Sequence, residues 1–194
     1  MSNPKCPNCG SLDTRKYLYG YPPANFNDKE FILGGDVLFE SNPLYHCNNC
    51  GTDFGLRVGN VPGSNLLSQH TLENFTFTEY SPVGGTTRIS VFMERGERKV
   101  EIEGTLDEDG DPNASAEYIV TTEIWEDLKE RLINEVFILS WPADVIEQSS
   151  AEPYIWSIFM GFKNGKQIQL AGKEAHPPYY NELRKILDTY FVYD

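Results

Sequence analysis

Two short stretches of the sequence share the pattern Cys-x-x-Cys-Gly: Cys6-Pro7-Asn8-Cys9-Gly10 and Cys47-Asn48-Asn49-Cys50-Gly51. Each stretch is a tight turn that points two thiolates and nearby backbone N–H groups at one ion, and its glycine relieves steric conflict where the chain reverses. Two such turns supply four sulfur donors, which suit tetrahedral Zn²⁺ and leave no coordination position open. The sequence therefore predicts a structural zinc site whose ligands are Cys6, Cys9, Cys47 and Cys50.

Disulfides, free thiols and iron are the alternatives to zinc at these cysteines. Disulfides are rare inside cells, where we expect this protein, and free thiols would not need the paired spacing. A rubredoxin-like iron site uses similar turns, so the spacing alone leaves iron open. We expect zinc, whose binding contributes roughly 10–16 kcal/mol at neutral pH and folds modules too small to fold unaided.

Length and composition are those of a globular protein. The chain has 194 residues, and its content of 40% hydrophobic and 23% charged residues excludes intrinsic disorder. No apolar run approaches the roughly 18–20 residues of a membrane span. The polar first residues also lack the apolar stretch of a secretory signal. We therefore expect a cytoplasmic protein that does not enter a membrane.

The net charge narrows the class of partner. Sixteen Lys and Arg against 29 Asp and Glu leave −13, of which −12 falls on residues 61–194. A nucleic-acid-binding protein usually presents a positive face that neutralises phosphates. An acidic surface repels polyanions and anionic lipids. We therefore expect a protein partner rather than nucleic acid or membrane.

Residues from about Val61 to Ser68 are rich in Pro, Gly, Ser and Asn, which is typical of a linker. This composition predicts two domains, a zinc ribbon over residues 1–60 and an acidic α+β domain over 61–194. Alternating apolar residues and turn sequences predict strands in the second domain. The expected strands are Thr71–Tyr80, Arg88–Met93, Lys99–Glu103, Tyr154–Phe162 and Lys166–Ala171.

Two helices are expected in the second domain. The first covers Thr122–Val136, with Trp125 beside apolar residues at helical spacing. The second begins at Pro177-Pro178, since proline is favoured in the first turn of a helix. Their expected buried residues are Ile124, Leu128, Leu132 and Val136 in the first helix, and Tyr179, Leu183, Ile186, Leu187 and Tyr190 in the second.

The two predicted hairpins resemble one another, which suggests a duplicated hairpin–helix unit. Ser90-Val91-Phe92-Met93 aligns with Ser157-Ile158-Phe159-Met160, and each hairpin precedes a helix. We expect both hairpins in one antiparallel sheet of four or five strands, with both helices on one face. Alternation then predicts that Val91, Met93, Ile158 and Met160 lie under the helices, and Phe92 and Phe159 on the opposite face.

The other candidate site residues have structural explanations. His46 is expected to be a strand residue rather than a ligand, and His176 a helix-entry residue, while His70 has no catalytic partner nearby in sequence. The acidic run Asp107, Asp109 and Asp111 lacks the Gly and Glu of a calcium loop. Gly34-Gly35 and Gly84-Gly85 lack the continuation of a phosphate-binding loop. Trp125, Trp141 and Trp156 are expected in the core.

Residues 4–55 resemble a family of uncharacterised bacterial zinc-ribbon proteins. The resemblance rests on Cys6–Gly10, Leu18–Pro22, Ile32–Gly35 and Pro43–Gly51. It implies a zinc ribbon with the four cysteines as ligands and a bacterial cytoplasmic protein, but it implies no activity. Members of that family often have Cys after Leu-Gly-Gly, where this chain has Asp36.

The sequence contains no constellation of catalytic residues, and its four cysteines are already assigned to the metal. We therefore expect a non-enzymatic adaptor that binds another protein. A nucleic-acid-associated zinc ribbon is the first alternative, and it requires Lys5, Arg15, Lys16 and Arg57 to converge on one face. An enzyme with a pocket in residues 61–194 is the second.

Overall fold

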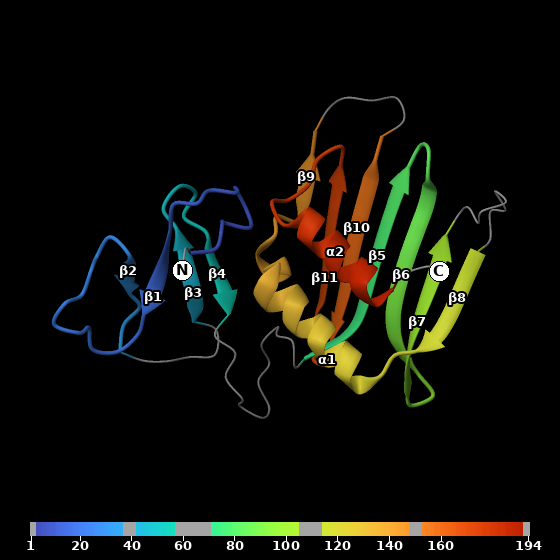
Figure 1. The fold of residues 1–194 in the computed structure, drawn as a ribbon, viewed down its shortest axis with the longest axis horizontal. Coiled ribbons are helices and arrows are strands. Elements are labelled where there is room, and N and C mark those ends of the chain that lie inside the picture. The colour runs from blue at the N-terminus through green and yellow to red at the C-terminus, as the bar shows by residue number, and fades with distance from the viewer. Residues whose placement is uncertain (1–2, 37–41, 57–70, 105–113, 148–152, 192–194) are drawn as a thin grey trace.

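The structure is a computed structural model that describes residues 3–36, 42–56, 71–104, 114–147 and 153–191. These residues form two β-sheets and two α-helices, an α+β architecture as predicted (Figure 1). The predicted linker, His70 and the acidic run at 107–111 lie outside the described residues. None of the helices in the described ranges is long and apolar enough to cross a membrane.

The N-terminal sheet, here called the small sheet, carries the cysteines. Its strands are β1 (Thr14–Leu18), β2 (Phe31–Leu33), β3 (Pro43–Cys47) and β4 (Asp53–Leu56), in the order β2-β1-β3-β4. β3 is antiparallel to both β1 and β4, whereas β2 runs parallel to β1. The first cysteine turn precedes β1 and the second joins β3 to β4, so the pairing of β1 with β3 brings the two turns together.

The second sheet, here called the large sheet, has the strand order β8-β7-β6-β5-β10-β11-β9 among the described residues. Neighbouring strands of this sheet run antiparallel, except that β9 and β11 run parallel to each other. The strands are β5 (Leu72–Ser81), β6 (Gly85–Glu94), β7 (Glu97–Gly104), β8 (Ala114–Ile119), β9 (Asp144–Ile146), β10 (Ile155–Phe162) and β11 (Gln167–Lys173).

The sheet is thus wider than the four or five strands predicted. The expectation missed β8 and β9. β8 is an edge strand whose Glu117, Tyr118 and Ile119 are all exposed, so it lacks an alternating pattern. β9 has only three residues. An element this short or this exposed leaves no periodicity for a sequence to reveal.

The turn between β6 and β7 confirms one predicted hairpin. Arg95 and Gly96 both have positive φ, 52° and 89°. Positive φ at both central residues is what a type I′ turn requires, and its twist matches that of the strands it joins. The second predicted hairpin, β10–β11, is also present, with Gly165 at φ 78° in its turn.

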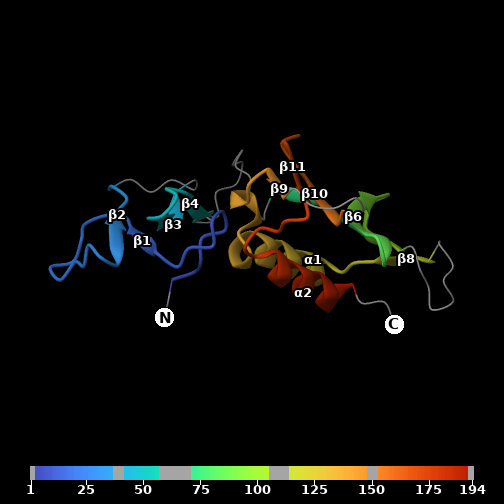
Figure 2. The same ribbon diagram turned by 90° about the horizontal axis from the view of Figure 1, so that it is seen from above.

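Both helices pack on the same face of the large sheet (Figure 2). α1 spans Thr122–Glu130, begins with the Thr121 side chain accepting from the Ile124 N–H, and continues as a π-helical turn over Arg131–Glu135. A short 3-10 turn, Ile138–Ser140, follows. α2 spans Tyr180–Tyr190. One predicted core residue is wrong: Ile124 is 38% exposed, because Trp125 takes the inward position in that turn.

The predicted faces of the large sheet are confirmed. Phe75 pairs with Val91 on one side and Met160 on the other, so these residues share a face. Met93 has the same orientation but is 47% exposed, because it lies at the end of β6. Phe92 and Phe159 point to the opposite face. The helix residues expected over the apolar face are all buried: Leu128, Leu132, Leu183 and Leu187.

One hydrophobic core extends from the small sheet into the large one. Phe137, which follows the π-helical turn, joins them: its ring centroid is 5.3 Å from that of Phe54 in β4 and 5.5 Å from that of Tyr179 before α2. Its backbone has φ 52°, a conformation that a non-glycine residue adopts only when surrounding contacts hold it. The core also contains Trp125, Trp141 and Trp156, as predicted.

Candidate metal centre

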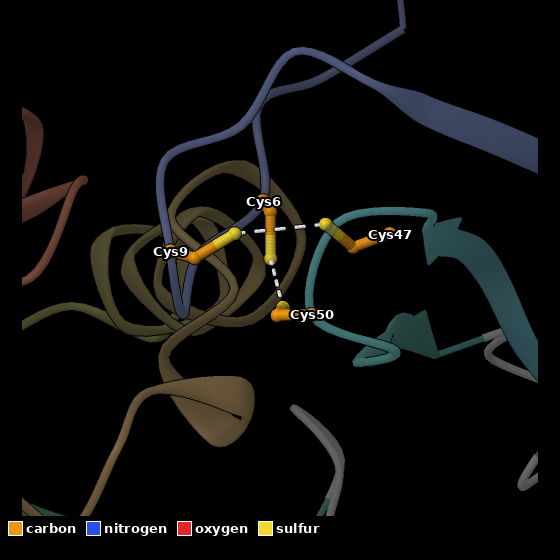
Figure 3. Close-up of side chains that lie close together, drawn as sticks. All are labelled: Cys6, Cys9, Cys47 and Cys50. Carbon is orange, nitrogen blue, oxygen red and sulfur yellow. Dashed lines mark hydrogen bonds between the residues drawn. The ribbon is translucent and has the colours of Figure 1, made fainter.

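The structure brings the four predicted cysteines together (Figure 3). Their sulfur atoms all lie within 4.8 Å of one another. The Sγ atoms of Cys6 and Cys50 are 3.6 Å apart, as are those of Cys9 and Cys47. Each close pair therefore takes one sulfur from each turn, so the cluster exists only when both turns meet.

The two cysteine turns have the same backbone geometry. Gly10 N–H donates to Cys6 O and Gly51 N–H donates to Cys47 O, both at 2.9 Å. Both glycines have φ 74°, in the left-handed region that glycine adopts without steric cost. This equivalence explains why the same five-residue pattern occurs twice.

Side-chain amides cross from each turn to the sulfur of the other. Asn8 Nδ2 donates to Cys50 Sγ at 3.7 Å, and Asn49 Nδ2 donates to Cys9 Sγ at 3.6 Å. Both asparagines occupy the second variable position of their motif. This role is not among the predictions from the sequence, although Asn at equivalent positions of both motifs is a signal for it.

The four thiols differ in their surroundings. Cys6 and Cys47 are buried, whereas Cys9 and Cys50 are exposed. Burial raises the pKa of the Cys6 thiol to about 12 and raises that of Cys47 as well. The Thr52 hydroxyl, 3.2 Å from Cys50 Sγ, lowers the pKa of that thiol to about 6.

The donor set fits a tetrahedral metal ion. Four thiolates at a Zn–S distance of about 2.3 Å place neighbouring sulfurs about 3.8 Å apart. The two closest sulfur pairs, at 3.6 Å, are near that separation. Backbone N–H groups of Asn8 and Cys9 point at Cys6, and those of Asn49 and Cys50 point at Cys47, where they would stabilise thiolates. Four clustered cysteines of this kind could hold Zn²⁺.

The other candidates lie outside this cluster. His46 Nδ1 is 2.6 Å from Asp53 Oδ1, across β3 and β4, as expected for a strand residue. Asp36, which follows Gly34-Gly35, is exposed and outside the cluster. Gly34 allows the Tyr19 ring to pack closely against the backbone, since an added Cβ at residue 34 would lie 2.2 Å from that ring. His176 lies four residues before α2, which begins at Tyr180 rather than at the predicted Pro177-Pro178, and it contacts Tyr154 and Tyr180.

Comparison with protein-family models, curated proteins and solved structures finds no match for this chain. The resemblance of residues 4–55 to bacterial zinc-ribbon proteins therefore stays a prediction. The structure itself shows a four-cysteine cluster beside an N-terminal β-sheet, within a mixed α+β chain.

Proposed function

We propose that the small sheet is a zinc ribbon and that Cys6, Cys9, Cys47 and Cys50 hold one structural Zn²⁺. The observation that carries this proposal is the meeting of four sulfurs from two equivalent turns. Bound zinc would crosslink two segments that lie about 40 residues apart in sequence. With four protein ligands the ion has no position for substrate or water, so its contribution is to stability.

We further propose that the whole chain is a cytoplasmic, non-enzymatic adaptor that binds another protein. The net charge of −13 and the closed donor set support this role. The nucleic-acid alternative is less well supported, because Lys5 is paired with Glu182 at 2.8 Å and Arg15 donates to Asn48. Arg15 and its neighbour Lys16 also point to opposite faces of β1.

Elemental analysis of protein purified without chelator tests the metal site. The expected result is one zinc per chain, lost in Cys9→Ser, because three sulfurs cannot complete the tetrahedral set. Leu12→Ser is the matched control, since Leu12 is 78% exposed and lies three residues from Cys9. Protein without metal, or iron in place of zinc, contradicts the proposal.

The same variant tests whether the metal supports only the ribbon. All three tryptophans lie outside the small sheet and are buried, in α1, after the 3-10 turn and in β10, so tryptophan emission reports on the second domain. We expect Cys9→Ser to lose the structure of the ribbon while residues 70–194 keep a native-like emission maximum. Loss of both structures together would show that the second domain depends on the metal.

A further inference from the structure

A polar pocket of about 410 Å³ lies beside the N-terminal end of α2, and none of the cysteines lines it. Its walls come from β5, the β5–β6 hairpin, the residues before β10 and the first turns of α2. This volume is within the range of about 300–1,000 Å³ typical of small-molecule pockets. The lining includes Glu79, Thr87, Tyr154, His176, Asn181 and Arg184.

The inner wall is a closed hydrogen-bond network around Glu79, whose side chain is 15% exposed. The Tyr154 hydroxyl donates to Glu79 Oε2, and the Tyr180 hydroxyl donates to the same oxygen at 3.2 Å. The Arg184 guanidinium forms an ion pair with the other oxygen, Glu79 Oε1. The two tyrosine oxygens are 2.8 Å apart. Because the carboxylate already has three donors, it holds the tyrosine rings in place and offers little to a ligand.

The pocket has no net charge at neutral pH. The charges of Glu79 and Arg184 cancel through their ion pair. Desolvation lowers the pKa of His176 below its usual value, so its imidazole is neutral at pH 7. Neither an anion nor a cation therefore finds an uncompensated opposite charge here, and the net charge of the whole chain further disfavours anions.

Three polar groups remain available for a ligand. The Asn181 amide, the Thr87 hydroxyl and the His176 ring nitrogens make no hydrogen bond to the described part of the chain. Each group can both donate and accept hydrogen bonds. Beside them the His176 ring packs on Tyr180, with centroids 4.2 Å apart, and on Tyr154, at 5.1 Å. The pocket thus combines the exposed His176 ring with groups that donate and accept hydrogen bonds.

We propose that this pocket binds a neutral, hydroxyl-rich ring of monosaccharide size. Hydroxyl groups also donate and accept, so they complement Asn181, Thr87 and His176. The apolar C–H face of a sugar ring can pack against the exposed His176 ring, which itself rests on Tyr154 and Tyr180. This site goes beyond the adaptor role and does not depend on bound metal for its chemistry.

Saturation-transfer NMR on the full zinc-bound chain tests this site. The neutral probes are glucose, galactose, mannose and N-acetylglucosamine, and the charged probes are glucosamine and glucose 6-phosphate. We expect at least one neutral sugar to bind in the millimolar range and the charged sugars to bind more weakly. Methyl glycosides of the bound sugar distinguish a free monosaccharide from the end of a glycan, since only a site for linked sugars tolerates the methyl group.

Variants then locate the bound sugar. Asn181→Ala and His176→Ala should each weaken binding roughly tenfold, because each removes one hydrogen-bonding partner. Lys185→Ala, one turn further along α2 and exposed, should leave binding unchanged. Zinc content, measured on the same samples, separates this proposal from that of the metal site. Absence of binding by every neutral sugar, tighter binding of a charged sugar, or undiminished binding by both pocket variants would overturn the proposal.

Discussion

At the scale of single residues, close packing explains positions that carry no chemistry. Gly172 in β11 lies against Trp156, which is fully buried and donates its indole N–H to Ala175 O at 2.8 Å. A Cβ at residue 172 would lie 2.2 Å from Trp156 Nε1. The glycine is therefore required by the tryptophan rather than by its own backbone conformation.

Gly172→Ala should accordingly destabilise the protein by about 1–3 kcal/mol, the usual cost of overpacking a core. Equilibrium unfolding in urea, followed by tryptophan fluorescence, measures the change. Lys173→Ala, exposed and next in the same strand, is the control and should change stability little. Equal stabilities of the two variants would mean that Trp156 moves aside without cost.

At the scale of elements, the start of α2 connects the four-cysteine cluster with the rest of the molecule. Tyr179 donates its hydroxyl to the Lys5 carbonyl at 2.9 Å, one residue before the first cysteine. Lys5 Nζ lies 2.8 Å from Glu182 and 4.5 Å from the centre of the Tyr179 ring. The next residue, Tyr180, instead points to Glu79 and Tyr154 in the pocket.

Tyr179→Phe should therefore cost about 0.5–1.5 kcal/mol by removing one hydrogen bond. Tyr17→Phe, which removes an exposed hydrogen bond to Asp53, is the matched control and should cost less. In the Cys9→Ser background, where the ribbon is unfolded, Tyr179→Phe should cost almost nothing. A cost that persists in the double variant would show that the hydroxyl does not act through the docked ribbon.

At the scale of the whole molecule, the net charge determines which charged polymers the protein can bind. The deficit of −12 on residues 61–194 predicts no measurable binding to duplex DNA at physiological salt. Any binding at low salt should map to the ribbon and weaken steeply as salt rises, as expected for a few phosphate contacts. Mobility-shift assays check this, and salt-resistant, sequence-selective binding would favour the nucleic-acid alternative.

The sequence by itself determined the features that depend on near neighbours along the chain. The cysteine turns, the Arg95-Gly96 hairpin and the buried stripe of α2 follow from local backbone requirements and side-chain periodicity. The sheet faces of residues in the two predicted hairpins also followed, because side chains alternate between the two faces along a strand. These features account for the four clustered cysteines and for much of the core.

Only the tertiary structure decided which distant elements meet. The hydrogen bond between Tyr180 and Glu79 joins residues 101 positions apart, and no local pattern marks either residue as a partner of the other. The contact of Phe137 with Phe54 likewise depends on how the two sheets pack. Periodicity states which face of an element is apolar, whereas the identity of its neighbour depends on topology. The pocket and the packing of the small sheet against the rest of the molecule therefore emerged only from the folded chain.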